Sequence, residues 1–550
     1  MAEPQKAPVM RWWGWGDPAH PAGLPQHALA FLKDSVGIAE RAHPPVALEH
    51  VQLPPARLQG PVLDRLGMLL GGEGLRSDRV ARILHAAGKG YPDLVGMRSG
   101  QPGEAPDAVA YPSGAAQLRA LLALCARESV AVVPFGGGTS VVGGVAPLAG
   151  GHRGVVSLDM GRMGSILGLD RQSRTVRVQG GVRAPALERH LAPGGLTLGH
   201  FPQSYEYVTL GGCAATRSAG QASTGYGAIE KMILGLRLLA PAGDIELPPL
   251  PATAAGPGLR QLLVGSEGTL GVIAELALRV RRAPQETVYE GVFFHDFQSG
   301  TAALRALAGE HAPADVVRLS DEQETRMSLA LAGSGGAKGM LGRAYLGARG
   351  YGGGCLAILG FEGEREELSF RRGRALALAR SYGGLPVGRS PGEAWRHARF
   401  SGPYLRDDLL THGVMAETLE TAGQWSDLAR LYGGVRRAIS TALGEWGTPG
   451  LVMCHVSHVY ETGASLYFTF LARQHREDPI GQWWAAKSAA GEAILAGGGT
   501  ITHHHAVGRD HAPWMSREIG AEGLAALAAV KSELDPAGIM NPGKLGLLSR

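Results

Sequence analysis

The most informative stretch of the chain reads Pro134-Phe135-Gly136-Gly137-Gly138-Thr139-Ser140, and it follows directly on the apolar run Val130 to Val133. Three successive glycines permit positive φ angles and allow neighbouring backbone N–H groups to form one concavity, which suits an anionic phosphate. Taken alone, such a run is also typical of a flexible turn. The stretch lacks the Gly-Lys-Ser/Thr of a Walker loop and the spacing G-x-G-x-x-G. The common nucleotide-binding folds are therefore disfavoured.

Two further glycine clusters follow the first one along the chain. One runs from His200 to Gly212 and continues through Ala215 to Gly220, and the other runs from Val264 to Ile273. Each cluster places small residues beside hydroxyl groups and backbone donors. A large flat cofactor with a pyrophosphate requires such close approach to the backbone. Three clusters of this kind form a specific pattern, whereas one would not.

The composition indicates a globular protein of several domains. The chain has 550 residues, of which 83 are glycine, 45% are hydrophobic and 19% are charged, and its mean hydropathy is -0.01. This length predicts about two or three domains. The glycines have no Gly-X-Y period, which excludes collagen. The formal charge of +4 is too small to indicate nucleic-acid binding, so we expect small-molecule partners.

The cysteines and the N-terminal sequence indicate a reduced, cytoplasmic setting. The four cysteines lie far apart in the sequence and form no C-x-x-C pair: Cys125, Cys213, Cys355 and Cys454. A cytosolic protein rarely uses disulfides. The N-terminal residues show no signal peptide, and no long uncharged apolar run indicates a transmembrane helix. Peripheral contact with a membrane is compatible with this pattern.

Alternating strand and helix patterns predict the organisation of the chain. Short β-branched runs predict strands at 130–133, 155–158, 175–178 and 262–264, and an amphipathic pattern predicts a helix from Ser113, as the N-cap, to Glu128. After residue 284 we expect strands at 287–294, 315–319 and 355–361 and helices at 298–309 and 363–382, with the helices on one face of a sheet. Residues 481–550 are expected to be mostly helical.

The triplet His503-His504-His505 is the densest group of titratable side chains. It follows three glycines and Thr500-Ile501-Thr502, which predicts a turn that enters a strand. Side chains alternate between the faces of a strand, so at most two of the three histidines would share a site. Imidazoles suit zinc, but no carboxylate or cysteine lies near in sequence, and we therefore predict no metal. A structural role and polar catalytic contacts remain as alternatives.

Arg406 and Tyr467 each allow a functional and a structural interpretation. The guanidinium of Arg406 can bind a phosphate or a carboxylate through two hydrogen bonds, or it can form a surface ion pair with Asp407 or Asp408. Tyr467 lies in an alternating run and is either a core aromatic or, with a lowered pKa, a group that exchanges a proton with a substrate.

The three glycine clusters resemble the FAD-binding fold of the vanillyl-alcohol oxidase and p-cresol methylhydroxylase family. The resemblance implies that FAD is the cofactor, with the pyrophosphate at the first cluster and the ribityl chain and isoalloxazine at the other two. Thr139 and Ser140 stand where several relatives attach the flavin through a histidine, which implies noncovalent FAD. The residues implicated are Pro134, Phe135, Gly136, Gly137, Gly138, Thr139, Ser140, Pro202, Gln203, Ser204, Tyr205, Glu206, Tyr207, Val208, Ala215, Thr216, Arg217, Ser218, Glu267, Gly268, Thr269, Leu270, Gly271, Val272 and Ile273.

Five further motifs make the chain similar to the alkylglycerone-phosphate synthases, which are also called alkyl-dihydroxyacetone-phosphate synthases. They occur in the same order: Trp-Gly-Trp-Gly at 13–16, Arg-Leu-x-Asp at 318–321, Tyr-Leu-Arg-Asp at 404–407, Tyr-x-x-Gly-Ala-x-x-Tyr-Phe at 460–468, and His-His-His-x-Val-Gly at 503–508. His455 and His458 depart from the pattern of these synthases.

The resemblance implies an α+β fold with four segments. A mostly helical N-terminal segment (1–103) precedes a two-subdomain FAD-binding domain of the p-cresol methylhydroxylase type (104–283). An antiparallel-sheet cap domain (284–480) and a segment that closes the active site (481–550) follow. We further expect a homodimer.

The resemblance also implies the reaction. Such synthases exchange the acyl group of acyl-dihydroxyacetone phosphate for a long-chain fatty alcohol, with no net oxidation, and the flavin acts covalently through its N5 atom. Arg406 would hold the phosphate, Tyr467 would move the C1 proton, and Arg318 with His503, His504 and His505 would organise the polar site. An apolar tunnel in the cap would take the alkyl chains of these lipid substrates.

A second hypothesis is an FAD-linked oxidase or dehydrogenase of a 2-hydroxy acid such as D-lactate or glycolate. Arg406 could bind the carboxylate, and a histidine could act as the base. Those relatives carry His-x-Gly-Asp-Gly-Asn-x-His and Glu-His-Gly-x-Gly stretches, whose metal-binding Asp, Asn and Glu are absent from the corresponding segments 455–467 and 504–508. A protein that only stores flavin is disfavoured, because three polar clusters exceed what binding alone requires.

Overall fold

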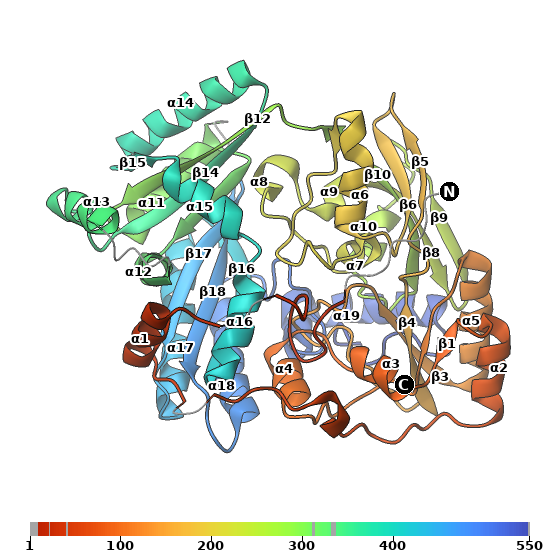
Figure 1. The fold of residues 1–550 in the computed structure, drawn as a ribbon. Coiled ribbons are helices and arrows are strands. Elements are labelled where there is room, and N and C mark those ends of the chain that lie inside the picture. The colour runs from red at the N-terminus through yellow and green to blue at the C-terminus, as the bar shows by residue number, and fades with distance from the viewer. Residues whose placement is uncertain (1–8, 21–22, 40–41, 311–313, 332–336, 548–550) are drawn as a thin grey trace.

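A computed structural model describes residues 9–20, 23–39, 42–310, 314–331 and 337–547. Residues 1–8, where the expected N-terminal segment begins, lie outside these ranges. The described chain forms two halves that lie side by side, with the large seven-stranded sheet on the left of Figure 1 and the sheets of the glycine clusters on the right. The segment boundaries at 103, 283 and 480 stay a prediction.

The first glycine cluster follows the edge strand of a four-stranded sheet. The strand order is β1 (Leu75–Arg76), β2 (Ala108–Ala110), β4 (Gly154–Asp159) and β3 (Val130–Phe135), and β2, β4 and β3 are parallel. Parallel strands covered on both faces are continuously apolar, which explains the run Val130 to Val133. Residues 539–541 return to this sheet, because Val132 donates to the carbonyl of Ile539 and accepts from the N–H of Asn541.

A five-stranded antiparallel sheet supports the other two clusters, because the third cluster runs into its strand β10 (Val272–Arg279) and helix α7 (Leu210–Ala215) of the second cluster packs against that strand. Its order is β5 (Ile166–Asp170), β6 (Thr175–Gln179), β10 (Val272–Arg279), β8 (Ile233–Ala240) and β9 (Gly243–Leu247), and β11 (Arg281–Arg282) pairs with β7 (Leu196–Thr197). The α-helices of this half and of the N-terminal region are α1 (Gln26–Ser35), α2 (Pro61–Leu70), α3 (Arg79–Leu84), α4 (Tyr91–Arg98), α5 (Ala115–Glu128), α6 (Ala184–Leu191), α7 (Leu210–Ala215), α8 (Ser223–Tyr226), α9 (Ile229–Met232) and α10 (Leu259–Leu263).

The cap is an antiparallel sheet with helices on both faces. Its order is β15 (Leu385–Gly388), β12 (Glu286–Phe294), β14 (Cys355–Gly363), β13 (Val316–Ser320), β17 (Leu451–Val459), β18 (Gly463–Arg473) and β16 (Val414–Gln424). The remaining α-helices are α11 (Phe297–Gly309), α12 (Glu322–Leu331), α13 (Ala337–Ala348), α14 (Arg365–Ser381), α15 (Ser390–Ala398), α16 (Gly402–Thr411), α17 (Leu428–Glu445), α18 (Pro479–Ala496) and α19 (Met515–Leu534).

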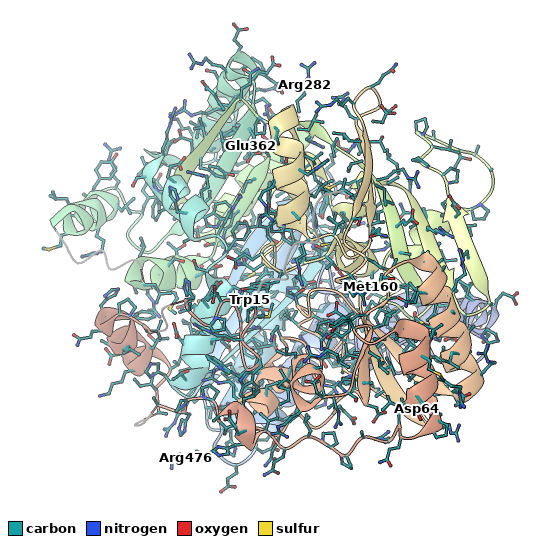
Figure 2. The ribbon with its side chains drawn as sticks, turned by 45° about the vertical axis from the view of Figure 1, so that its right-hand side comes forward. Trp15, Asp64, Met160, Arg282, Glu362 and Arg476 are labelled. Carbon is teal, nitrogen blue, oxygen red and sulfur yellow. The ribbon has the colours of Figure 1, made fainter. Side chains whose placement is uncertain are left out.

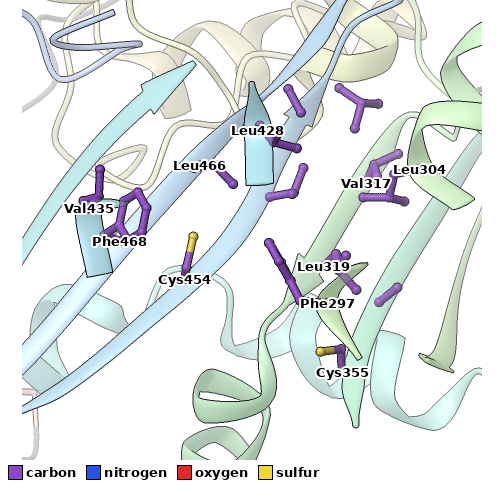
Figure 3. Close-up of a cluster of buried hydrophobic side chains, with 14 of the residues drawn as sticks. Phe297, Leu304, Val317, Leu319, Cys355, Leu428, Val435, Cys454, Leu466 and Phe468 are labelled. Atoms are coloured by element: carbon purple, nitrogen blue, oxygen red, sulfur yellow. The ribbon is translucent and has the colours of Figure 1, made fainter. Parts of the chain in front are cut away.

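Side-chain alternation separates the two faces of the cap sheet. Leu466, Phe468 and Cys454 point into the large core beneath α11, α14, α17 and α18, part of which Figure 3 shows. Their neighbours His455 and Tyr467 point to the opposite face, as the two-residue period of a strand requires. The same strands therefore supply both a hydrophobic core and a row of polar side chains.

Most of the predicted elements are confirmed, and four details were wrong. Ser113 is not the N-cap of α5, because the helix begins after Gly114 and the Ser113 hydroxyl bonds to Gln117 instead. The run 262–264 ends helix α10 and is not a strand. Helices α1, α12 and α16 pack on the second face of the cap, which was expected to be free of helices. The histidine triplet lies in a loop and not in a strand.

All four cysteines are buried and free. Among the described residues, no helix has the length and the apolar composition needed to cross a bilayer.

We predict that Phe468→Ala destabilises the cap. The side chain is fully buried, so its removal leaves a cavity and is expected to lower the free energy of unfolding by about 3–5 kcal/mol. Urea or thermal unfolding followed by circular dichroism measures the effect. The control is Phe370→Ala, because this side chain is 69% exposed on α14. Equal stability of the two variants would contradict the assignment of the core.

Candidate active site

One cavity of about 510 Å³ lies between the two halves of the molecule. Its first wall is formed by the glycine clusters, and its second wall is formed by the polar face of the cap sheet with α12 and α16. The predicted cofactor residues that line it are Pro134, Phe135, Gly136, Gly137, Gly138, Thr139, Ser140, Pro202, Gln203, Ser204, Val208, Ala215, Thr216, Ser218, Glu267, Gly268, Gly271, Val272 and Ile273.

The first glycine cluster is packed so closely that side chains are excluded. A Cβ atom on Gly136 would lie 2.3 Å from the hydroxyl oxygen of Thr209, and one on Gly137 would lie 2.3 Å from the carbonyl oxygen of Tyr207. Gly138 has a φ of +67°, which side chains rarely adopt. The bare backbone is thus held open toward the cavity, and this cradle fits the pyrophosphate of FAD.

Some of the predicted cofactor residues lie behind the cavity wall and support it. Tyr205 stacks on Phe400 and contacts Phe201 with tilted rings, and Glu206 accepts a hydrogen bond from Tyr404. Tyr207 meets the ring of Trp15 edge to face. Arg217 and Thr269 donate to backbone carbonyls, and Leu270 lies in the hydrophobic core. Their role at the cofactor stays a prediction.

A buried carboxylate on β16 holds the loop of three histidines. Oε1 of Glu420 accepts the backbone N–H groups of His503 (3.0 Å), His504 (2.6 Å) and His505 (2.7 Å). Nδ1 of His505 lies 2.7 Å from Oε2, without the alignment of a hydrogen bond. Burial would raise the pKa of Glu420, but His505, His504 and the backbone donors lower it well below its usual value. Glu420 is far from the histidine triplet in the sequence, so the residues around the triplet did not indicate this carboxylate.

The histidine side chains continue this network toward solvent. The hydroxyl of Tyr460 lies 2.6 Å from Nε2 of His503, whose Nδ1 lies 2.9 Å from Nδ1 of His504. Burial lowers the pKa of both histidines, so we assign them as neutral. His504 and His505 line the cavity, whereas His503 does not.

Two groups of side chains come close enough to share a cation. In one group His458, His503 and His504 lie together, and in the other Glu420 joins His504 and His505, with ligand atoms within 4.8 Å of one another. The two Nδ1 atoms at 2.9 Å are closer than the roughly 3.3 Å expected between two tetrahedral zinc ligands. A shared proton explains this contact, and the absence of a metal stays a prediction.

Tyr467 lies at the centre of the polar face. The strand register places it opposite Glu420 on one side and His455 on the other. Its ring stacks on His455 (4.7 Å between centroids) and meets the edge of His505 (5.3 Å). Burial raises the pKa of Tyr467, so the phenol stays protonated near neutral pH. The alternative that requires a lowered pKa is therefore not supported, and the phenol is suited to donate a proton.

Arg318 belongs to an ionic group beside Tyr467. It donates to Glu324 and to Nε2 of His455 (3.0 Å), while Nδ1 of His455 lies 3.0 Å from the other oxygen of Glu324. Burial would raise the pKa of Glu324, but His455 and Arg318 lower it to about 2. Glu324 is therefore ionised. All three side chains line the cavity.

His455 and His458, which departed from the motif, have definite places in the structure. His455 supports the ring of Tyr467 and joins the ionic group of Arg318. Nε2 of His458 lies 3.0 Å from the carbonyl oxygen of Gly220, so this histidine links β17 to the second glycine cluster. Burial lowers the pKa of His458 to about 3, which keeps it neutral.

Arg406 faces the cavity and does not form the surface ion pair that was its alternative. Asp407 instead accepts the backbone N–H of Trp15, and Asp408 accepts that of Gly23. Nη1 of Arg406 donates to the carbonyl of Lys89 (2.7 Å). Within the described ranges, neither Asp407 nor Asp408 pairs with this guanidinium, which leaves it available for a ligand.

An apolar end completes the cavity. It is lined by side chains from α12, α16 and the far ends of the cap strands: Met327, Leu331, Leu405, Leu409, Ala416, Met453 and Leu471. Leu32 of α1 and Val36, which directly follows that helix, pack against the same group from outside. One cavity therefore joins the glycine cradle, a polar centre and an apolar compartment.

Several residues of the site were missed from the sequence. Glu324, Lys89 and Trp15 line the cavity, and Glu420 anchors the histidine loop. Ala416, Thr418 and Glu420 are spaced two residues apart on β16 and therefore share one face of the strand. This two-residue period could have placed Glu420 on the side of the cavity. Lys89 and Trp15 carry no such periodic signal.

Two families of FAD-dependent proteins match the chain. The FAD binding domain matches residues 106–247, and the C-terminal domain of FAD linked oxidases matches residues 283–545. Together with the cradle, these matches define the protein as an FAD-binding enzyme, and the predicted cofactor FAD is confirmed. A solved structure of p-cresol methylhydroxylase, with 15% identity and a TM-score of 0.67 over 90% of this chain and 98% of its own, has the same fold.

Relatives with higher sequence identity show to which family of FAD-binding enzymes the chain belongs. The alkyldihydroxyacetonephosphate synthase of Trypanosoma brucei brucei is 34% identical over 98% of this chain and 92% of its own length. That of Dictyostelium discoideum is 33% identical over 91% of this chain and 83% of its own. A solved structure of such a synthase superposes with a TM-score of 0.84 at 29% identity, covering 97% of this chain and 98% of the other. The chain belongs to the alkyldihydroxyacetonephosphate synthase family, as the motifs predicted.

We predict that Gly137→Ala abolishes cofactor binding. The new methyl group would lie 2.3 Å from a backbone carbonyl oxygen that cannot move independently, so the cradle must deform. The flavin absorbance per mole of purified protein is expected to fall at least tenfold. Gly72→Ala is the control, because a Cβ atom there meets nothing within 4 Å. Full flavin content in Gly137→Ala would show that the cradle lies elsewhere.

We also predict that Glu420→Ala releases the histidine loop. Three backbone N–H groups lose their shared acceptor, and unsatisfied buried donors cost about 1–3 kcal/mol each. Limited proteolysis should cut the chain near residues 500–508 in the variant but not in the parent. Glu461→Ala, at an exposed position of the neighbouring turn, serves as the control. An unchanged cleavage pattern would argue against the anchoring role.

Proposed function

We propose that the protein exchanges the acyl group of acyl-dihydroxyacetone phosphate for a long-chain fatty alcohol and so forms the ether bond of ether lipids. The observation that carries the proposal is the single cavity in which an FAD cradle, a Tyr–His centre, free cationic donors and an apolar compartment meet. An apolar compartment suits alkyl chains, and cationic donors suit a phosphate. The names of the relatives point to the same substrates.

The exchange needs no net oxidation. The bond between C1 and the acyl oxygen breaks and releases a fatty acid, and a bond between C1 and the oxygen of the alcohol forms. The proton of the alcohol is released in this step and balances the proton taken up by the leaving group. When bound, FAD supplies a ring atom that is capable of covalent catalysis.

The side chains around Tyr467 are suited to these proton transfers. The protonated phenol of Tyr467 would donate to the leaving oxygen, and a neutral imidazole of His504 would accept a proton from C1 or from the alcohol. Glu420 fixes the histidine backbone, and the ionic group of Arg318, Glu324 and His455 orients the phenol ring. Arg406 would hold the phosphate at the other end of the polar centre.

The second hypothesis, a 2-hydroxy acid dehydrogenase or oxidase, is weaker. The relatives above 30% identity described here are synthases. The compartment formed by Met327, Leu409, Met453 and Leu471 also exceeds the needs of a small hydroxy acid. The expected homodimer and peripheral membrane contact belong to the present proposal, and sedimentation alone and with lipid vesicles tests them.

We predict that the purified protein with FAD converts palmitoyl-dihydroxyacetone phosphate and labelled hexadecanol into the alkyl product and palmitate. Extraction and chromatography of the label measure the product. Dye reduction by D-lactate or glycolate without ether product would contradict the proposal and support the second hypothesis.

Two variants test the role of the Tyr467 phenol in this assay. Tyr467→Phe should retain its flavin and lower turnover roughly 10²- to 10⁴-fold, because it loses only the proton donor. Tyr351→Phe is the matched control, since its exposed hydroxyl bonds to the carbonyl of Gly383 far from the cavity. Full turnover by Tyr467→Phe would remove the phenol from the mechanism.

A further inference from the structure

The N-terminal turn of residues 11–16 covers one wall of the cavity. The N–H of Arg11 bonds to the carbonyl of Gly16, and the N–H of Trp15 donates to Oδ2 of Asp407 on α16 (2.6 Å). Figure 2 shows Trp15 near the middle of the molecule, and its side chain is only 2% exposed. Trp15, Lys89 and Arg406 all line the cavity.

These three side chains hold donors that the protein leaves unused. In the part of the chain that the structure describes, Nε1 of Trp15 and Nε of Arg406 have no hydrogen-bond acceptor. The ammonium of Lys89 makes one long contact, 3.4 Å to the carbonyl of Arg11. An unsatisfied buried donor is costly, and such a group in a native protein calls for an explanation. The three side chains that carry these donors line the same cavity.

Contacts within the protein bring the three donors together. Nη1 of Arg406 donates to the backbone carbonyl of Lys89, and the ammonium of Lys89 points to the turn that carries Trp15. Asp407, which accepts from the backbone of Trp15, follows Arg406 directly on α16. The turn, the segment before α4 and helix α16 thus meet at one place.

Two cationic and two acidic side chains meet where the turn, the segment before α4 and α16 come together. Lys89 and Arg406 are cationic groups, and two buried carboxyls face them, Asp407 on α16 and Asp93 on α4. Oδ2 of Asp93 accepts from the N–H of Gly90 and Oδ2 of Asp407 accepts from that of Trp15, while Oδ1 of Asp407 is buried and has no partner among the described residues. Burial raises the pKa of both carboxyls and lowers that of Lys89 to about 8, so a bound dianion would favour the charged form of Lys89 and the protonated form of the two carboxyls.

We infer that Trp15, Lys89 and Arg406 form the binding pocket for the phosphate group of the substrate, and that the N-terminal turn completes this pocket. The inference rests on the proposed function and adds two residues to it. Three donors from three segments match the several oxygens of a phosphate monoester better than the two of a carboxylate. The pyrophosphate of FAD has its own cradle at Gly136 to Gly138.

The test compares two variants with matched controls. Trp15→Phe keeps the ring and removes only the N–H group, and Lys89→Met keeps the length and removes the charge. Trp13→Phe is the control in the same turn, because Trp13 stacks between Arg11 and Arg98 and does not line the cavity. Lys33→Met on the exposed face of α1 is the control for the charge.

We expect KM for palmitoyl-dihydroxyacetone phosphate to rise about 3- to 10-fold in Trp15→Phe and about 10- to 100-fold in Lys89→Met, which corresponds to the loss of a neutral and a charged hydrogen bond. KM for hexadecanol and the flavin content should not change, and the controls should behave as the parent protein does. An unchanged KM for the phosphate substrate in both variants would overturn the inference. Loss of flavin with an unchanged KM in the flavin-bearing fraction would assign the donors to the cofactor and also overturn it.

A binding measurement separates this inference from the proposed function. Titration of the FAD-loaded protein with dihydroxyacetone phosphate and with dihydroxyacetone, followed by calorimetry, needs no turnover. Tighter binding of the phosphate compound that weakens in both variants would support the pocket even if the parent protein makes no ether product. Equal affinity of parent and variants for dihydroxyacetone phosphate would overturn the pocket even if the synthase activity is present.

Discussion

The buried carboxylate of Glu420 is the constraint on which the polar site depends. One oxygen collects three consecutive backbone N–H groups, and this fixes the direction of three imidazoles that no regular element would hold together. Because the same strand register sets Glu420 beside Tyr467, the loop and the phenol are held relative to each other. Burial lowers the pKa of His503 and His504, so these two histidines remain neutral, whereas the pKa of Glu420 lies well below its usual value and the carboxylate stays ionised.

The cap sheet serves two purposes because its side chains alternate. On one face Phe468 and Leu466 bury the core, and on the other face Tyr467 and His455 form the site. A rigid sheet with a packed core under it holds catalytic groups more precisely than a loop would. The apolar compartment uses the same strands further along, so the chain-binding and the chemical parts of the cavity share one support.

The fold and the cofactor could be predicted because the glycine clusters and motifs that carry the family resemblance are local signals in the sequence. The close approach at Gly137 leaves its mark in the sequence, since only glycine fits there. The partners of the histidines were not predictable in this way. Glu420 is 83 or more residues from the triplet, and Lys89 meets Arg406 across a separation of 317 residues. The strand expected at the triplet was wrong because a tertiary hydrogen bond, and not a sheet, satisfies its backbone.

The return of residues 539–541 to the edge strand β3 has a consequence for biosynthesis. Asn541 bonds to the carbonyls of Gly144 and Glu267, and the first of these contacts spans 397 residues. A chain emerging from the ribosome would present the glycine cradle long before the residues that brace it. The nascent protein would therefore hold its flavin firmly only after translation has passed the cap, so cofactor capture comes late and reports on a completed fold.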